Sequence, residues 1–318
     1  MNIFAGLLTI IGLAVFEIIT SIDNAIINAS VLSTMSQKAR KWFLLWGMLF
    51  AVFVIRGILP FLIIFLTDPS QSFTHVLGAT FRGDEETAAV IEHSSRILLT
   101  GGGIFLVFLF FHWVFLEEKN FAFKFEELVQ RQGVWFYAII SVLLTAVVWF
   151  SININPALAI GAVVGSTSFF IIHGVREQAE KQEKKLQNTN NPMSDISKII
   201  YLEILDATFS IDGVIGAFAF TFSVLLILIG NGIGAIVLRQ LTVGNIERIK
   251  RYKYLRNGAM YSIFVLGSFM LLNGLGYKTP TWISPIATLL IVGYFFQISR
   301  KAQAQDPNMA PAIVKNTK

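Results

Sequence analysis

Nine hydrophobic runs follow one another along the chain, and each is long enough to cross a lipid bilayer as a helix. A helical span needs about 20 apolar residues, because the hydrocarbon layer is about 30 Å thick. The first run would be about 45 Å long as one continuous helix, so we expect it to tilt, to protrude or to break. The pattern predicts an all-α polytopic membrane protein with spans near 3–32, 42–66, 97–116, 134–151, 157–173, 199–219, 223–241, 258–275 and 282–299.

The composition agrees with membrane insertion. Hydrophobic residues make up 54% of the 318 positions and charged residues only 14%, with a mean hydropathy of +0.65. Such a chain is too apolar for an ordinary soluble domain. The absence of cysteine excludes disulfides, thiolate metal ligands and cysteine nucleophiles. The net charge of +5 is not accompanied by any nucleic-acid-binding motif, so we expect no nucleic-acid partner.

Lysine and arginine concentrate in alternate connections between the runs. They follow the first, third, fifth, seventh and ninth runs, whereas the opposite connections hold only Arg82, Arg96 and Lys278. Loops rich in lysine and arginine stay on the cytoplasmic side of a membrane. The first run also lacks a basic leader and a cleavage site, so we expect it to be retained. The chain is therefore predicted to lie in the inner (plasma) membrane, with the N-terminus outside and the C-terminus cytoplasmic.

Two of the runs contain polar motifs of the same form. An acid, three further residues and then Ser-Ile-Asp occur in EIITSID from Glu17 and again in DATFSID from Asp206. Further on, GMLFAVFVIRG aligns with GNGIGAIVLRQ, which pairs Arg56 with Arg239. Five runs precede the second copy, and an odd number places it in the membrane in the opposite direction. Inverted three-helix repeats with polar interruptions in matching helices indicate a secondary transporter.

The acids of the two motifs are the candidate ligands of a cation. An ionised carboxylate at the bilayer centre costs about 2.5–3.5 kcal/mol, so several acids together need compensating charge. Asp23 and Asp212 lie about 240° round an ideal helix from Glu17 and Asp206. All four can therefore share a site only if a helix breaks or if the cation lies at a common seam. The oxygen donors suit Mg²⁺, Ca²⁺ or Mn²⁺.

The predicted site has two groups of residues. The metal ligands are expected to be Glu17, Asp23, Asn24, Asp206 and Asp212, and the supporting residues Ser21, Asn28, Glu203, Ser210, Asn231, Arg56 and Arg239. Several structural alternatives stay open. Glu203 could be the partner of an arginine, and serine and asparagine often serve helix packing. The glycines of TGGGIF and GNGIG are expected at close helix contacts, and His112 is expected to be packed or hydrogen-bonded rather than to bind a ligand.

The chain resembles the TerC family of integral membrane proteins, within the lysine-exporter superfamily. The resemblance is carried by EIITSIDNAIINASVL from Glu17, LEILDATFSIDGVIGAF from Leu202, the two arginine stretches and GGGIFL in the third run. It implies Mn²⁺ efflux in exchange for protons, with Mn²⁺ as substrate and no permanently bound cofactor. The implied residues are Glu17, Asp23 and Asn24 in the first motif and Glu203, Asp206, Ser210 and Asp212 in the second. Gly213 replaces the counterpart of Asn24, and nine spans place the chain in a divergent subgroup.

We therefore expect a transporter rather than an enzyme. Residues 1–133 would form the first repeat, 134–173 two linking spans, 174–198 a charged cytoplasmic linker, 199–275 the second repeat, and 276–318 the last span and tail. The expected partners are the lipid bilayer, a divalent cation and protons, with an oligomer or envelope proteins as further options. The alternative is a non-transporting membrane partner or a stress-response assembly factor linked to tellurium resistance. An intramembrane serine hydrolase is disfavoured, because no histidine shares the motif runs.

Overall fold

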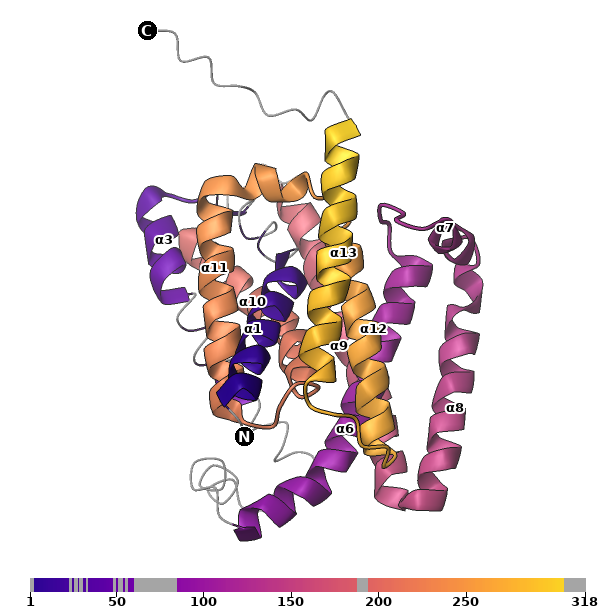
Figure 1. The fold of residues 1–318 in the computed structure, drawn as a ribbon. Coiled ribbons are helices and arrows are strands. Elements are labelled where there is room, and N and C mark those ends of the chain that lie inside the picture. Colours follow the sequence, from indigo (N-terminus) through magenta and orange to yellow (C-terminus); the bar gives the residue numbers. More distant parts are fainter. Residues whose placement is uncertain are drawn as a thin grey trace, which may run out of the picture.

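The computed structural model describes residues 3–22, 25, 28, 31–32, 34–47, 50, 54, 57–59, 85–187 and 194–305. Within these residues the protein is all-helical, with no strand (Figure 1). The main helices are α1 (Ile3–Thr20), α3 (Gln37–Trp42), α6 (Glu85–Leu116), α7 (Lys124–Gln130), α8 (Phe136–Ile154), α9 (Pro156–Gln187), α10 (Asp195–Ala217), α11 (Val224–Lys250), α12 (Leu255–Gly274) and α13 (Ile283–Gln305). Two short segments complete them, the π-helix η1 (Phe43–Gly47) and the 3-10 helix η3 (Gly133–Trp135). The predicted all-α membrane class is confirmed.

Six of the described helical segments are long and apolar enough to cross a membrane, namely 3–20, 95–116, 133–154, 156–178, 255–274 and 283–304. Helix α11 contributes a shorter apolar stretch, Val224–Leu238. Helix α10 fills the predicted sixth run and carries Glu203, Asp206 and Asp212, but it is not among these six segments. Most of the predicted second span, 42–66, lies outside the described residues. The count of nine spans therefore stays a prediction.

Helix α6 is the central helix of the bundle. In its segment 95–116, 89% of the residues are buried, against 17% for the segment that contains α8, so α8 lies at the edge (Figure 1). Glycines allow the close approach of α6 to its neighbours. The Gly101 carbonyl would overlap a Cβ added at Gly165 of α9, and Gly103 contacts Leu271 of α12 in the same way. The TGGGIF glycines therefore occupy close helix contacts, as expected.

The contacts between helices fix their relative directions. Gly12 meets Phe220, Phe16 meets Gly216 and Glu17 meets Gly213, so α1 and α10 are antiparallel. Along α6, Thr100 faces Gly274 and Leu106 faces Gly267, so α6 and α12 are also antiparallel. These are the directions that an inverted repeat requires, although the repeat itself stays a prediction.

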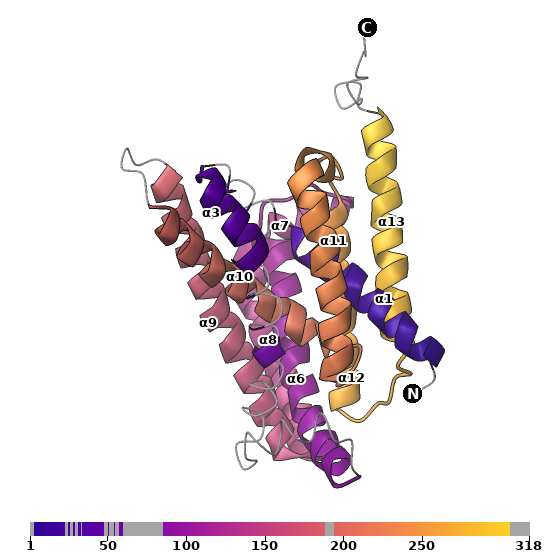
Figure 2. The same ribbon diagram turned by 90° about the vertical axis from the view of Figure 1, so that its left-hand side faces the viewer.

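The basic connections gather at one end of the bundle. In Figures 1 and 2 the C-terminal ends of α6, α9, α11 and α13 all point towards the top, while the N-terminus of α1 lies near the bottom. Hydrogen bonds also join the two halves at the upper end. The Asp195 carboxylate, at the start of α10, accepts from the Ser36 hydroxyl at 2.5 Å, and Lys198 Nζ donates to the Thr34 carbonyl at 2.9 Å. The basic connections, which alternate along the sequence, thus lie together at one end of the folded protein.

Candidate ion site between the motif helices

The Glu17 side chain is buried where α1 passes between α10 and α11. The residue is 1% exposed. Its Oε2 lies 3.3 Å from the position that a Cβ would occupy on Gly213, and its Cβ and Cγ lie 2.7 and 2.8 Å from the corresponding position on Gly234 of α11. Both glycines leave room that a larger residue would fill. The acid of the first motif therefore packs directly against the second motif, at the residue that follows Asp212.

The serine of each motif donates to a different acceptor. Ser21 Oγ donates to Glu17 Oε1 at 2.7 Å, so it orients the carboxylate. Ser210 Oγ donates to the main-chain carbonyl of Asp206 at 2.6 Å, within its own helix. Both residues are buried. The hydroxyl groups of the aligned serines thus donate to different kinds of acceptor, a side-chain carboxylate in the first motif and a main-chain carbonyl in the second.

Glu203 occupies a second buried acidic position, on the other side of α10. Both carboxylate oxygens of Glu203 are buried without a hydrogen-bond partner, and Oε1 would overlap a Cβ added at Gly47 of η1. Asp206 follows Glu203 by three residues, so the two carboxylates are neighbours on the helix surface. No arginine that the structure describes contacts Glu203, and the structural alternative of an arginine partner gains no support from these residues.

Each of the two acids, Glu17 and Glu203, contacts a helix from the opposite half of the chain. Helix α1 places Glu17 against Gly234 in the second helix of the predicted second repeat. Helix α10 places Glu203 against Gly47, in the predicted second span of the first repeat. Each motif helix therefore packs against the partner helix of the opposite half. Each acid thus meets a glycine of the other half, at two separate contacts.

Two asparagines in the described part of the chain have buried side-chain atoms without a hydrogen-bond partner. Asn231, one turn before Gly234 on α11, is 2% exposed and has no hydrogen-bond partner for either side-chain atom. Asn28 Oδ1 is likewise buried without a partner. Burying a polar atom without a hydrogen-bond partner costs free energy. The amide oxygens at these positions are therefore suited to bind a cation directly or through a bound water.

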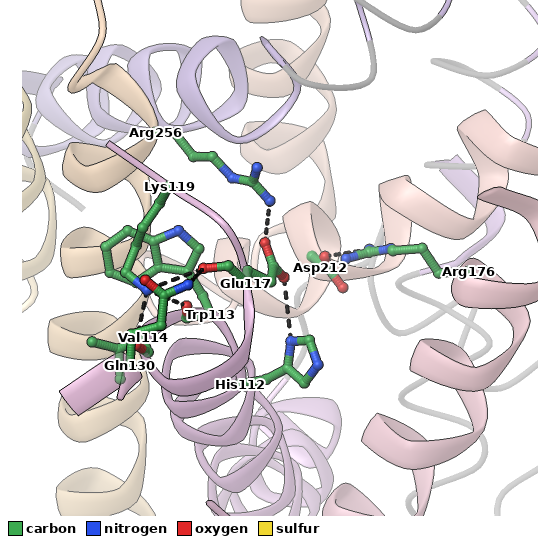
Figure 3. Close-up of polar contacts among 9 residues, drawn as sticks. All are labelled: His112, Trp113, Val114, Glu117, Lys119, Gln130, Arg176, Asp212 and Arg256. Atoms are coloured by element: carbon green, nitrogen blue, oxygen red, sulfur yellow. Dashed lines mark hydrogen bonds and ion pairs between the residues drawn. The ribbon is translucent and has the colours of Figure 1, made fainter. Parts of the chain in front are cut away.

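Asp212 belongs to a different environment. Its Oδ2 accepts from Arg176 Nη2 of α9 at 2.6 Å, and both side chains are nearly buried, at 11% and 12% exposure (Figure 3). Helix α10 is continuous through the motif, so Asp212 does not turn towards Asp206. The sequence pattern did not indicate Arg176 as a partner of an acid. Helix α9 continues into the segment interpreted as a linker, and it brings Arg176 to Asp212.

Next to this ion pair, Glu117 is the centre of a further polar network. Glu117 accepts from Arg256, at the start of α12, and from His112 Nδ1 at 3.2 Å (Figure 3). Burial alone would raise the pKa of Glu117, but the His112 hydrogen bond and the positive charges of Arg256 and Arg176 lower it from 4.5 to about 2. Glu117 is therefore ionised at physiological pH.

Lys119 holds the end of α6 at this position. Its ammonium donates to the carbonyls of Trp113, Val114 and Glu117 at 2.8 to 3.2 Å, and it lies 5.0 Å from the centre of the Trp113 ring. These carbonyls are among those that a helix end leaves without intrahelical partners. Lys119 thus fixes the main chain that carries Glu117.

Several predicted site residues lie outside this description. Asp23, Asn24 and Arg56 lie outside the described residues, and Arg239 lies on α11 but its side chain is not among those described. The predicted break of the first span falls on the same segment. The described side chains contain no group of three histidines, aspartates or glutamates that could hold a metal ion.

Sequence reasoning missed the network around Glu117. Its members, Glu117, His112, His173, Arg176 and Arg256, come from three helices that are distant in the sequence. His112 is packed and hydrogen-bonded, as expected, but its contact with His173 is not visible as a spacing along the chain. One feature of the sequence could have indicated the network. All five residues lie at or just beyond the ends of their spans that are predicted to be cytoplasmic.

Residues 22–305 match the family described as a protein of unknown function, DUF475. The chain belongs to this family. No curated protein and no solved structure matched the chain. The match covers α6 to α13, including the second motif helix α10, and begins just after α1; the family description leaves the activity open.

Proposed function

We propose that this DUF475 protein is a secondary transporter that exports a divalent cation, Mn²⁺, in exchange for protons. The observation that carries the proposal is the buried Glu17 carboxylate, which lies against Gly213 of the antiparallel motif helix. An acid inside a membrane protein is costly and marks an ion or proton pathway. Here two such helices meet, as expected for the binding site of a transporter with inverted repeats.

The donor set favours a hard cation. Glu17, Asp206 and Glu203 supply carboxylates, Asn231 supplies an amide, and Asp23 and Asn24 are predicted to join them. Oxygen ligands of this kind suit Mn²⁺, Mg²⁺ and Ca²⁺. The resemblance of the motifs to the TerC family favours Mn²⁺ among these. Asp212 could contribute only after its ion pair with Arg176 opens.

The test is Mn²⁺ accumulation in cells that lack other Mn²⁺ exporters. We expect Glu17→Gln and Asp206→Asn to leave the cells loaded with Mn²⁺, whereas the parent clears it. Glu127→Gln is the matched control, since Glu127 is exposed and pairs only with Arg131 one turn away among the described side chains. If both motif variants cleared Mn²⁺ as fast as the parent at equal expression, the transport proposal would be wrong.

One observation favours the second candidate, a non-transporting membrane partner of other envelope proteins. The Asp212–Arg176 ion pair neutralises a motif acid within the protein, which is what a structural role requires. Such a protein would tolerate Glu17→Gln and would be sensitive to changes in its basic connections. The Mn²⁺ measurement therefore separates the two candidates.

A further inference from the structure

Two histidines face each other across the contact between α6 and α9. The ring centres of His112 and His173 are 3.8 Å apart, and the rings are inclined at 54°. His112 is 8% exposed and donates Nδ1–H to Glu117, because a carboxylate can only accept. The second nitrogen of His112, Nε2, is then left with a lone pair.

Packing alone does not explain two imidazoles at this position. Phe136 of α8 lies edge-on to His112, and Phe169 stacks on His173 at 5.7 Å with an angle of 7°. The surrounding positions are thus filled by phenylalanine, which would serve equally well in an apolar contact. Histidine differs because it gains and loses a proton near neutral pH.

The charged groups around the pair balance one another. Glu117 lies at the end of α6, Arg176 and Glu177 follow His173 on α9, Asp212 faces them from α10, and Arg256 faces them from α12. Among the buried or half-buried members, two carboxylates and two guanidinium groups sum to zero. Two imidazolium rings 3.8 Å apart would repel strongly. A proton on one ring therefore opposes a second proton on the other.

We propose that His112 and His173 form a proton-binding pair through which cation transport is coupled to protons. This inference rests on the transport function proposed above. The proton adds to Nε2 of His112, which becomes an imidazolium while its Nδ1–H stays donated to Glu117, and it leaves from the same nitrogen. The pair lies at the end of α6 predicted to be cytoplasmic. The pair does not include Glu17, so in this proposal the proton and the cation bind to different side chains.

The first measurement is a ¹⁵N-histidine NMR titration of the full chain in lipid nanodiscs between pH 5 and 8. We expect a histidine signal that titrates as one proton in the parent and disappears in His112→Gln. His75→Gln and His93→Gln identify the remaining histidine signals. If His112→Gln fails to fold, the His75→Gln and His93→Gln spectra still assign the signals of the pair in the parent by elimination. The inference is overturned if the His112 and His173 signals do not change over this range.

The second measurement is Mn²⁺-driven proton movement in proteoliposomes that contain a pH-sensitive dye. His112→Gln and His173→Gln should reduce it at least tenfold, and His93→Gln should retain the parental rate. Parental proton movement in both pair variants would overturn the inference. If the parent moves no Mn²⁺ although His112 titrates, the transport function fails and the proton site stands. If Mn²⁺ moves although neither histidine titrates, the proton site fails and the transport function stands.

Discussion

The Glu17 carboxylate of α1 lies 3.3 Å from the position that a Cβ would occupy on Gly213 of α10. This contact joins the first acidic motif to the second, across two antiparallel helices that are far apart in the sequence. It also explains why glycine stands in the second motif where the first has Asn24. A larger side chain at Gly213 would occupy the space beside the Glu17 carboxylate.

Alanine at Gly234 should destabilise the protein, because its Cβ would lie 2.6 Å from the Ala14 carbonyl oxygen and 2.7 Å from Glu17 Cβ. Forcing atoms into such a contact costs about 1–3 kcal/mol. Gly232→Ala is the matched control on the same helix, since nothing lies within 4 Å of its added Cβ. Thermal unfolding in detergent should show a lower midpoint for Gly234→Ala alone. Equal midpoints for the two variants would contradict the close contact of α1 and α11.

Removal of the Ser21 hydroxyl should weaken cation binding. Ser21 donates to Glu17 Oε1 at 2.7 Å, and a hydrogen bond to a charged group contributes about 1.5–3 kcal/mol. We expect Ser21→Ala to weaken Mn²⁺ binding about tenfold or more, as measured by calorimetry on the purified protein. Ser268→Ala is the control, because Ser268 donates only to a carbonyl of its own helix. Unchanged affinity in Ser21→Ala would show that the orientation of Glu17 does not matter for binding.

The Arg176–Asp212 ion pair should show strong coupling when its two members are removed singly and together. A buried charge without its partner destabilises by about 3–5 kcal/mol, so Asp212→Asn and Arg176→Gln should each lower the free energy of unfolding by such an amount. The double variant should lose much less than the sum of the two. A double-mutant cycle by chemical unfolding measures this coupling. Additive losses would mean that the two side chains do not interact.

The network at Glu117 should make stability depend on pH at the acid end. Its pKa in the folded protein is about 2, below the ordinary value of 4.5, so folding favours the ionised form. The stabilisation is complete above about pH 4.5 and is lost as the pH falls towards 2. It is on the order of 3 kcal/mol, from about 1.4 kcal/mol for each tenfold change in proton affinity.

Glu117→Gln should remove this pH dependence, whereas Glu118→Gln should keep it, because Glu118 is the exposed neighbour. Unfolding followed at pH 5 and at pH 3 distinguishes the variants. If the parent loses no more stability than Glu117→Gln between pH 5 and pH 3, the neighbours of Glu117 do not hold it in its charged form.

Much of the fold was predictable from hydrophobic length. The run at 97–116 ends with α6 at Leu116, and the run at 282–299 begins one residue before α13. Run length in a bilayer is set by the thickness of the hydrocarbon, so a count of apolar residues finds such helices. The run at 157–173 showed the limit of this reasoning. Helix α9 continues to Gln187, because a helix can extend into water after its apolar segment ends.

The sequence by itself determined that this is an all-helical membrane protein with two related acidic motifs. Both follow from residue type and spacing, which act locally. Only the tertiary structure decided which side chains meet. It placed Glu17 against Gly213, gave Asp212 to Arg176, and brought His112 to His173. These contacts depend on how helices distant in the sequence cross and pack, and no local pattern specifies which faces of two helices will touch.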